Sequence, residues 1–315
     1  MNNYFNLSVL MVFFTLLLNL LPHGSTAQIA FYSSDNLEKI KEGTTYIVVK
    51  EPDFQLPEAY IDIVKKYWTF SKIEFIKYNE VKDHIRLGNS FFMFGGYVLT
   101  KGISTYTYVY LSLWTPDEKY FKKEKKKAFE TYDQLELARI ELFTDYPTLE
   151  HPETVYKDEF DEYEHIRNWG PGFLKNYLQQ LMDLFKKGEE RLLTNSVLDQ
   201  NKIKTLAQET LYVPDYALIH FKKWGGDEST RTEEKALFKD YPFKYQLISN
   251  DELNEKILKA EQPFYYLVYV KSSTDKYISV VNAQTGELIY SQHDYGYNLE
   301  SKDLQKLADT IRKKK

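Results

Sequence analysis

The chain has one residue spacing typical of metal chemistry: a glutamate and a histidine three positions apart, Glu162 and His165. On a helix this spacing places a carboxylate and an imidazole on one face, as di-iron sites in helix bundles require. Those sites need a second such motif, whereas here a single motif lies beside Asp158, Glu159 and Asp161. We therefore interpret the stretch as a solvated acidic loop, with loose binding of a divalent cation as the alternative, and expect no ordered metal site and no other cofactor.

Signatures of the common hydrolases are missing from the sequence. It contains no GxSxG, SxxK or HExxH motif, and its 46 acidic residues are too many to single out a glycosidase pair. The cysteine count is 0, which excludes a thiol nucleophile, a thiolate metal site and a disulfide framework. We assign no catalytic residue and favour a non-catalytic protein. A hydrolase whose carboxylates meet His220 or His293 only in the fold is an alternative hypothesis.

Tyrosine is abundant, with 27 residues. Tyr106, Tyr108 and Tyr110 alternate with other residues, so on a strand all three rings project from one face. Such a row can stack against sugar rings or accept the apolar surface of a partner, and it is our candidate binding site. The structural alternative is that the rings cover a half-buried sheet and pair across strands.

The N-terminal stretch resembles a secretory signal. Residues 1–27 carry no charge, the run from Leu7 to Leu21 is mostly apolar, and Pro22 breaks the helix ahead of the small residue Ala27. About 15 apolar residues are fewer than the roughly 20 that span a bilayer, so a membrane anchor is disfavoured. We expect cleavage after Ala27 and export, either to the periplasm or as a secreted protein.

The net charge and the length of the chain limit the classes of protein to which it can belong. The formal net charge is −5 and the pI is near 5.8, so the basic footprint of a nucleic-acid binder is missing. The basic run at 122–127 is short, and we interpret it as a solvated surface. No later segment is apolar enough to be a transmembrane span. A chain of 315 residues can bury a sizeable core without disulfides and usually forms two domains.

One stretch occurs twice in a loose form: KIEFIKYNEVKDHI at 72–85 and KYQLISNDELNEKI at 244–257. The identical aligned pairs are Lys72/Lys244, Ile76/Ile248, Glu80/Glu252 and Ile85/Ile257. The segments on both sides also correspond in order, which favours an internal duplication over the general likeness of all strand–turn–helix units.

Hydrophobic periodicity predicts the elements of each unit. In the first unit strands are expected at 44–49, 72–78, 90–94 and 105–114, and helices at 57–68 and 79–85. In the second unit strands are expected at 210–214, 243–249, 264–270, 277–281 and 287–292, and helices at 229–241, 251–260 and 301–314. The fold class is therefore α/β, with α+β as the alternative: two similar mixed-sheet βαβαββ units joined by a helical insert.

The domain boundaries follow from this pattern: a first repeat at 28–115, a connector at 116–200 and a second repeat at 201–315. The connector is predicted to be charged and helical over 115–140 and an acidic loop over 145–165. It then forms an amphipathic helix at 172–187, which Gly188 ends. We expect that helix to pack between or beneath the two sheets.

The order of elements resembles the thioredoxin-like superfold over about 44–114 and 210–314. Pro263 lies just ahead of a strand, where that superfold keeps a cis-proline, but the first unit has Asn89 and Ser90 at the equivalent place. Neither unit has the CxxC pair, so the redox activity of the superfold is not carried over to any residue here.

Our leading hypothesis is an exported, non-catalytic binding or structural protein of the cell envelope. Its partner would be a protein or an envelope component, with a glycan as a further option and no nucleic acid. The main alternative is a carbohydrate-binding or glycan-processing accessory protein, which the same tyrosine row would serve.

Overall fold

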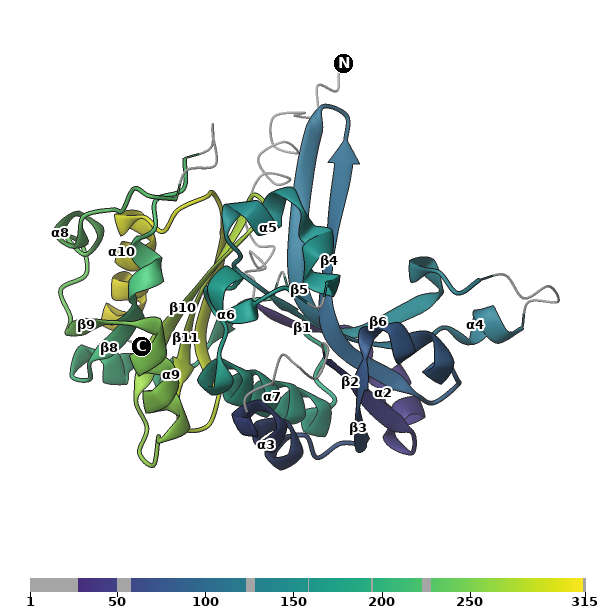
Figure 1. Cartoon of the computed structure of the whole chain (residues 1–315). Coiled ribbons are helices and arrows are strands. Elements are labelled where there is room, and N and C mark those ends of the chain that lie inside the picture. Colours follow the sequence, from purple (N-terminus) through teal and green to yellow (C-terminus); the bar gives the residue numbers. More distant parts are fainter. Residues whose placement is uncertain are drawn as a thin grey trace, which may run out of the picture.

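The structure is a computed structural model of the chain, and it describes residues 28–49, 58–122, 128–157, 159–193, 195–222 and 228–313. The predicted signal segment, 1–27, lies outside the described residues. The described chain forms two mixed sheets with helices between them (Figure 1). The predicted α/β class is therefore confirmed.

The two sheets have the same strand order. In chain-order labels, the first sheet runs β1 (Ile29–Phe31), β6 (Gln134–Glu141), β5 (Ser104–Pro116), β4 (Ser90–Lys101), β2 (Thr44–Val49), β3 (Lys72–Lys77). The second runs β7 (Val197–Leu198), β12 (Leu288–Tyr295), β11 (Asp275–Asn282), β10 (Tyr265–Ser272), β8 (Leu211–Pro214), β9 (Tyr245–Ile248). The strands of the repeated stretch, β3 and β9, occupy the same edge position in both sheets.

The directions of the strands also agree. In the first sheet β2 pairs in parallel with β3 and β4, and the remaining pairs are antiparallel. The second sheet repeats this scheme around β8. Parallel neighbours need a crossover, because a short turn cannot reverse the chain between them. Helix α3 (Glu58–Tyr67) supplies it between β2 and β3, and α9 (Asn250–Leu258) lies between β9 and β10.

The amphipathic helix predicted at 172–187 is confirmed as α7, Pro171–Lys187. Gly188 ends it with φ of 64°, a left-handed conformation that glycine adopts without steric cost. Helix α7 packs against both α3 and α9 and so lies between the two halves of the molecule (Figure 1). Its apolar side chains, among them Phe173, Leu178 and Leu181, are buried.

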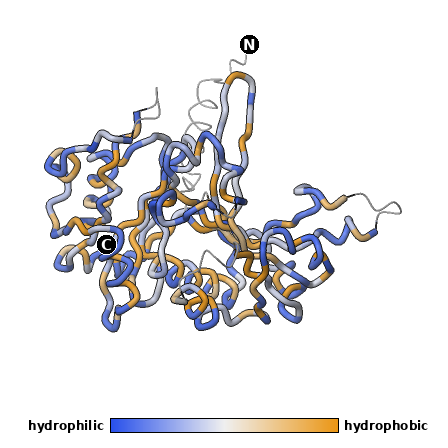
Figure 2. The backbone as a smooth tube through the Cα atoms, in the orientation of Figure 1, coloured by the Kyte–Doolittle hydropathy of each residue, from blue (hydrophilic) through white to orange (hydrophobic). Residues whose placement is uncertain are grey.

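One continuous apolar core extends through both halves and includes Leu113 of the first sheet and Val268 of the second. A smaller cluster around Phe91 and Trp114 covers the opposite face of the first sheet. Figure 2 shows apolar residues concentrated along the central strands, while the outer loops are mostly hydrophilic. The second half closes with α10 (Ser301–Arg312), close to the predicted helix at 301–314.

The connector differs most from expectation. The prediction that 115–140 is helical is wrong, because this range holds most of β6, and its helical turns in the described residues are the short α4 (Glu118–Phe121) and η2 (Thr131–Asp133). Strand β6 pairs with both β1 and β5, and ladder pairing on two sides outweighs the helical propensity of a charged segment. The sheets therefore take β6 and β7 from the range assigned to the connector.

Smaller differences concern the turns and the edges of the sheets. The helix predicted at 229–241 is reduced to α8 (Glu234–Leu237), and the acidic loop at 145–165 contains three short helical turns. These turns are α5 (Tyr146–Glu150), η3 (Pro152–Tyr156) and α6 (Glu162–His165). The edge strands β1 and β7 and the helix α2 (Ser34–Lys41) were not predicted. All peptide bonds of the described residues are trans, Pro263 included.

Candidate functional site

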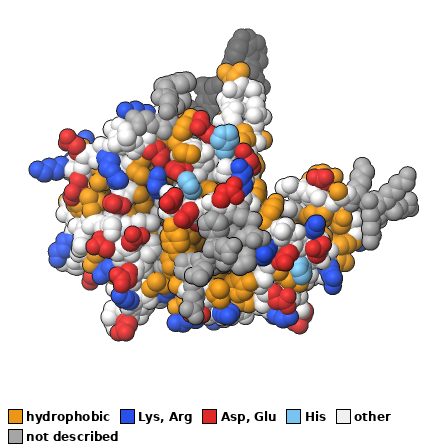
Figure 3. Space-filling model, viewed as in Figure 1, with side chains coloured by type: hydrophobic (Ala, Val, Ile, Leu, Met, Phe, Trp, Pro, Cys, Tyr) orange, Lys and Arg blue, Asp and Glu red, His pale blue; other side chains and the backbone are white. Residues whose placement is uncertain are grey.

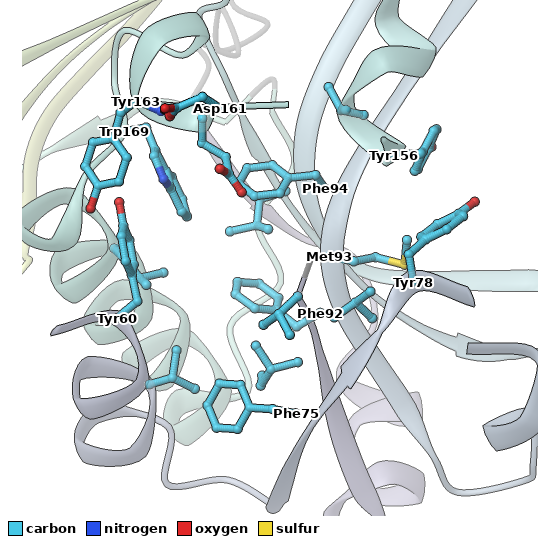
Figure 4. A pocket seen from close by; sticks show the side chains of 18 residues that line it. Tyr60, Phe75, Tyr78, Phe92, Met93, Phe94, Tyr156, Asp161, Tyr163 and Trp169 are labelled. Atoms are coloured by element: carbon cyan, nitrogen blue, oxygen red, sulfur yellow. The ribbon is translucent and has the colours of Figure 1, made fainter. Parts of the chain in front are cut away.

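An apolar pocket lies where the parallel strands of the first sheet reach their carboxyl ends. Its volume is about 310 Å³, and residues of β2, β3 and β4 line it together with residues of α3, α7 and the segment that precedes α7 (Figure 4). Ligands of open α/β sheets bind at this end of the strands. The volume lies at the small end of the range for ligand sites.

The floor of the pocket follows from strand register. Ile47 of β2 is the register partner of both Phe75 on β3 and Phe92 on β4, so the three side chains share one face of the sheet. Val64 of α3 and Leu174 of α7 close the same side. The repeated stretch thus contributes Phe75 to the pocket.

Aromatic rings form one wall. The rings of Tyr60 and Trp169 are stacked with centroids 5.6 Å apart, and Phe94 meets Trp169 edge-on at 5.0 Å. Tyr163 meets Tyr60 edge-on at 5.6 Å. Figure 4 shows the hydroxyl groups of Tyr60 and Tyr163 directed toward each other. Such offset and edge-on arrangements are the favoured geometries of aromatic pairs.

The polar groups of the pocket gather beside this wall. Asp161 lies near Tyr163 and Trp169 (Figure 4), and its carboxylate caps α6 by accepting a 2.8 Å hydrogen bond from the Tyr163 backbone N–H. Glu162 also lines the pocket. Burial raises the pKa of Tyr163 to about 12, and the nearby carboxylates of Glu162 and Asp161 add to this rise. Tyr163 is therefore a neutral phenol at neutral pH.

The hydroxyl of Tyr60 lies beside that of Tyr163. The Tyr60 side chain is 3% exposed, and the two hydroxyls face each other (Figure 4). Burial, followed by the neighbouring Tyr163, raises the pKa of Tyr60 far above its ordinary value, so the phenol stays neutral.

The pocket also reaches the opposite face of the first sheet, where Tyr78, Met93 and Tyr156 line it. The Tyr156 hydroxyl accepts a 3.1 Å hydrogen bond from the Gly96 backbone N–H. Gly95 and Gly96 both lie in regular register within β4. A Cβ at Gly96 would lie 2.5 Å from the carbonyl oxygen of Pro152, so glycine here permits close packing.

The predicted tyrosine row lies on β5. Tyr106, Tyr108 and Tyr110 are all half-buried, and Tyr97 of β4 joins their face as the register partner of Tyr108. The guanidinium group of Arg139 lies 3.9 Å from the ring centroid of Tyr110 and 5.5 Å from that of Tyr108. Two rings of the row are thus engaged within the molecule, and Tyr106 lies nearer the hairpin tip.

A buried ion pair with Glu141 fixes the position of Arg139 beside these rings. Its Nε lies 2.5 Å from Oε1 of Glu141, and the Ser272 hydroxyl donates to the other oxygen of that carboxylate. Ser272 belongs to β10, so the cluster joins the two sheets. Glu136, on the same strand as Arg139, has its pKa raised to about 7, chiefly because burial penalises its charged form.

The hairpin of β4 and β5 projects beyond the other described elements (Figure 1). Strand β4 pairs with β2 only through Ser90–Phe92, and β5 pairs with β6 only from Tyr110 onward. Within the described part of the chain, the outer arms therefore pair only with each other. At the tip Ile103 is fully exposed and follows Gly102, whose φ is 62°.

The glutamate and the histidine of the acidic spacing, Glu162 and His165, have different neighbours in the structure. His165 Nδ1 lies 2.8 Å from Asp145 Oδ2, while Glu162 lines the pocket. Among the described residues there is no group of three or more metal-ligating side chains. His293 pairs with Asp275 at 2.6 Å, and neither His293 nor His220 is among the described residues lining the pocket.

Several pocket residues were not identified from the sequence. Tyr60 comes from α3, whereas Asp161 and Trp169 come from the segment that precedes α7, and only the fold brings Tyr60 to the other two. The sequence signal was weak: an acidic run, 158–164, followed closely by a tryptophan.

The chain matches no protein-family model, no curated protein and no solved structure. None of the helices in its described part is long and apolar enough to cross a bilayer. On the face seen in Figure 3, acidic and basic side chains are intermingled.

Proposed function

We propose that the protein is a non-catalytic binding protein that holds an apolar small ligand in the pocket of its first half. The observation that carries the proposal is the combination of a 310 Å³ apolar cavity with few polar groups at the carboxyl ends of parallel strands. Cavities with this composition and position are the usual ligand sites of α/β proteins.

Displacement of a neutral fluorescent naphthylamine probe tests this function. The probe should bind to the wild-type protein, and Val49→Trp, which places a large ring in the pocket, should abolish binding. Val98→Trp is the matched control, since Val98 is 49% exposed on the projecting hairpin. Equal probe binding by the wild type and Val49→Trp would contradict the proposal.

A second function is binding of a partner through the projecting hairpin, as the tyrosine row suggested. Its open edges support this function, because a two-stranded ribbon is marginally stable in water until a further strand or surface covers it. The partner would be a protein or an envelope component. A glycan is the alternative, which would stack on the same rings.

Capture of partners from envelope extract tests the hairpin function. The wild type is compared with a triple variant that carries Tyr106→Ser, Tyr108→Ser and Tyr110→Ser. Loss of a captured partner with the triple variant supports it, and a glycan array distinguishes a sugar from a protein. Unchanged capture together with an empty array would exclude the tyrosine face as the binding surface.

We also infer that the two halves arose by duplication of a thioredoxin-like unit. The shared strand order and the parallel pairs around β2 and β8 support this origin. An experimental structure in which β3 and β9 lie at different positions in their sheets would contradict it.

We further propose that the protein is exported and cleaved after Ala27. The uncharged, apolar N-terminal stretch supports this proposal. N-terminal sequencing of the mature protein from the cell envelope or the medium is the test. A mature chain beginning at Met1 would contradict it.

A further inference from the structure

A second pocket lies beside the carboxyl-terminal half of α7, and most of the residues that line it are polar. Its volume is about 590 Å³. Residues of α7, of β7 and the segments on either side of it, and of the turn that leads into β12 form the lining. None of the described lining residues is shared with the apolar pocket, so the two are separate sites. A cavity of this size accommodates a small ligand.

The carboxylates that line this second pocket in the described chain each have a lysine partner. Asp183 Oδ2 lies 2.7 Å from Lys187 Nζ. Glu287 Oε2 lies 2.6 Å from Lys202 Nζ, and Asp199 Oδ2 lies 3.6 Å from the same nitrogen. Each acidic side chain of the lining is therefore paired within the molecule.

Arg191 is the lining cation without such a partner. Its backbone forms an antiparallel bridge with Phe31, with N–O distances of 2.7 and 2.8 Å, and this bridge fixes its position beside the pocket. In the described part of the chain its guanidinium group makes no ion pair and no hydrogen bond. Burial lowers the pKa of Arg191, and the charges of Glu189 and Asp183 oppose this shift only in part. A guanidinium group stays charged even so, and its N–H donors remain available here.

The side chain of Gln180 is a second, independent feature of the same pocket. It is 7% exposed and lines the pocket, and its amide has no hydrogen-bond partner among the described residues. The neighbouring Gln179, by contrast, accepts from Asn176 at 2.7 Å and donates to the Gln284 carbonyl at 3.1 Å. Buried polar groups of folded proteins nearly always have a partner. Hydroxyl groups of a ligand would supply both a donor and an acceptor to this amide.

The chemistry of these groups selects a class of ligand. A carboxylate matches the guanidinium group, because it accepts two parallel N–H bonds from it. The three lining carboxylates limit the negative charge that the pocket accepts, which favours a monoanion over a phosphate dianion. Hydroxyl groups on the same ligand would bond to the amide of Gln180 and to the remaining lone pairs of these carboxylates. Since the described lining contains no aromatic ring, a neutral sugar would lack a surface on which to stack.

We propose that the second pocket binds a uronate, a sugar ring that carries a carboxylate. The carboxylate of the ligand pairs with Arg191, and its hydroxyl groups bond to Gln180 and Asp183. The side chains of Val197 and Leu288, which also line the pocket, lie against its C–H groups. The site is separate from the apolar pocket, so this inference goes beyond the proposed function and is tested independently of it.

Calorimetric titration with three probes at about pH 7 tests the class of ligand: methyl β-glucuronide, methyl β-glucoside and acetate. The glucuronide has both ring hydroxyls and a carboxylate, and each of the other two probes lacks one of these features. We expect the glucuronide to bind at least about tenfold more tightly than either of the others. Equal affinity for the glucuronide and the glucoside, or for the glucuronide and acetate, would overturn the proposal. Failure of all three probes to bind would overturn the site itself.

Variants at Arg191 locate the charge that binds the carboxylate. Arg191→Gln should weaken glucuronide binding at least about tenfold, and Arg191→Lys, which keeps the charge without the planar pair of donors, should retain part of the affinity. Lys186→Gln is the matched control, because Lys186 is exposed on α7 and is not among the described lining residues. Equal losses in Arg191→Gln and Lys186→Gln would indicate a general effect of charge and would overturn the assignment.

The amide of Gln180 is tested with Gln180→Met, which keeps the length of the side chain and removes its polar atoms. We expect about fivefold weaker binding of the glucuronide, because the amide no longer bonds to the ring hydroxyls. The midpoint of thermal denaturation should be no lower than that of the wild type, since the amide has no partner within the described chain to lose. Unchanged glucuronide binding would contradict the placement of the sugar against Gln180.

Discussion

The two halves of the molecule share a strand order and differ in how completely they are packed. In the second half all eight residues of β10 are buried, whereas β4, its counterpart, is buried only near its base. The hairpin of β4 and β5 has arms of 12 and 13 residues, against 8 and 8 for β10 and β11. The additional length forms the projecting ribbon.

The two halves also differ at the carboxyl ends of their parallel strands, where the second half is filled by the chain itself and the first half has a pocket. In the second half the chain passes from β8 directly into η5 (Asp215–Leu218), whose Tyr216 and Ala217 are buried in the core. The first half has the apolar pocket near the corresponding end of β2. One topology thus carries a shorter, buried hairpin in one half and a longer, projecting hairpin in the other, and the apolar pocket and the tyrosine row both lie in the latter half.

The largest effect expected from this comparison concerns the ion pair of Lys276 and Asp303, both fully buried in the second half at 2.6 Å. Asp303→Ala leaves a buried ammonium group without its main counter-charge, which costs about 3–5 kcal/mol of unfolding free energy. Urea denaturation measures this loss. Asp309→Ala on the same helix is the control, since its pair with Arg312 is exposed and contributes little. Equal losses in both variants would contradict the view that packing stabilises the second half.

A pH-dependent effect is expected in the first half at Glu136, whose pKa is raised to about 7 by burial. As the pH rises above 4.5, the ordinary pKa of a glutamate, the unfolded chain releases the carboxyl proton of Glu136 before the folded chain does. The free energy of unfolding therefore falls until about pH 7. Glu136→Gln removes the penalty and should stabilise the protein by up to about 3 kcal/mol above pH 7. Denaturation near pH 4 should show no difference between the two proteins. A gain of equal size at both pH values would argue against burial of the charge as its cause.

A matched pair of valines compares the two hairpins directly. Val268 of β10 is 1% exposed and Val98 of β4 is 49% exposed. Val268→Ala should lower the unfolding free energy by about 2 kcal/mol, since it leaves a cavity, while Val98→Ala should stay within about 0.5 kcal/mol of wild type. Similar losses at both sites would show that the projecting hairpin is packed in solution.

The smallest effect is expected at the tip. Ile103→Ser exposes less apolar surface and removes no contact of the core, so the unfolding free energy should change by less than about 0.5 kcal/mol. Thermal denaturation is the measurement. A clear stabilisation or destabilisation would mean that the tip is covered in solution.

The sequence predicted the fold well where periodicity decides the structure. The strands around Ile76 and Ile248 and the helix ended by Gly188 all have strong local patterns. It failed at β6, where charged neighbours suggested a helix and pairing with two strands decided the outcome. It also missed the pocket, because no local pattern links Tyr60 to Trp169.

Helix α7 has a consequence for how the molecule unfolds. Its Lys175 ammonium group donates to the Ile257 carbonyl at 2.8 Å, its Gly172 N–H donates to the Asn254 side chain at 3.0 Å, and its apolar face lies in the core common to both sheets. Neither half separated from the other would keep this helix covered. We therefore expect the two halves to melt together in a single cooperative transition, although each carries its own sheet.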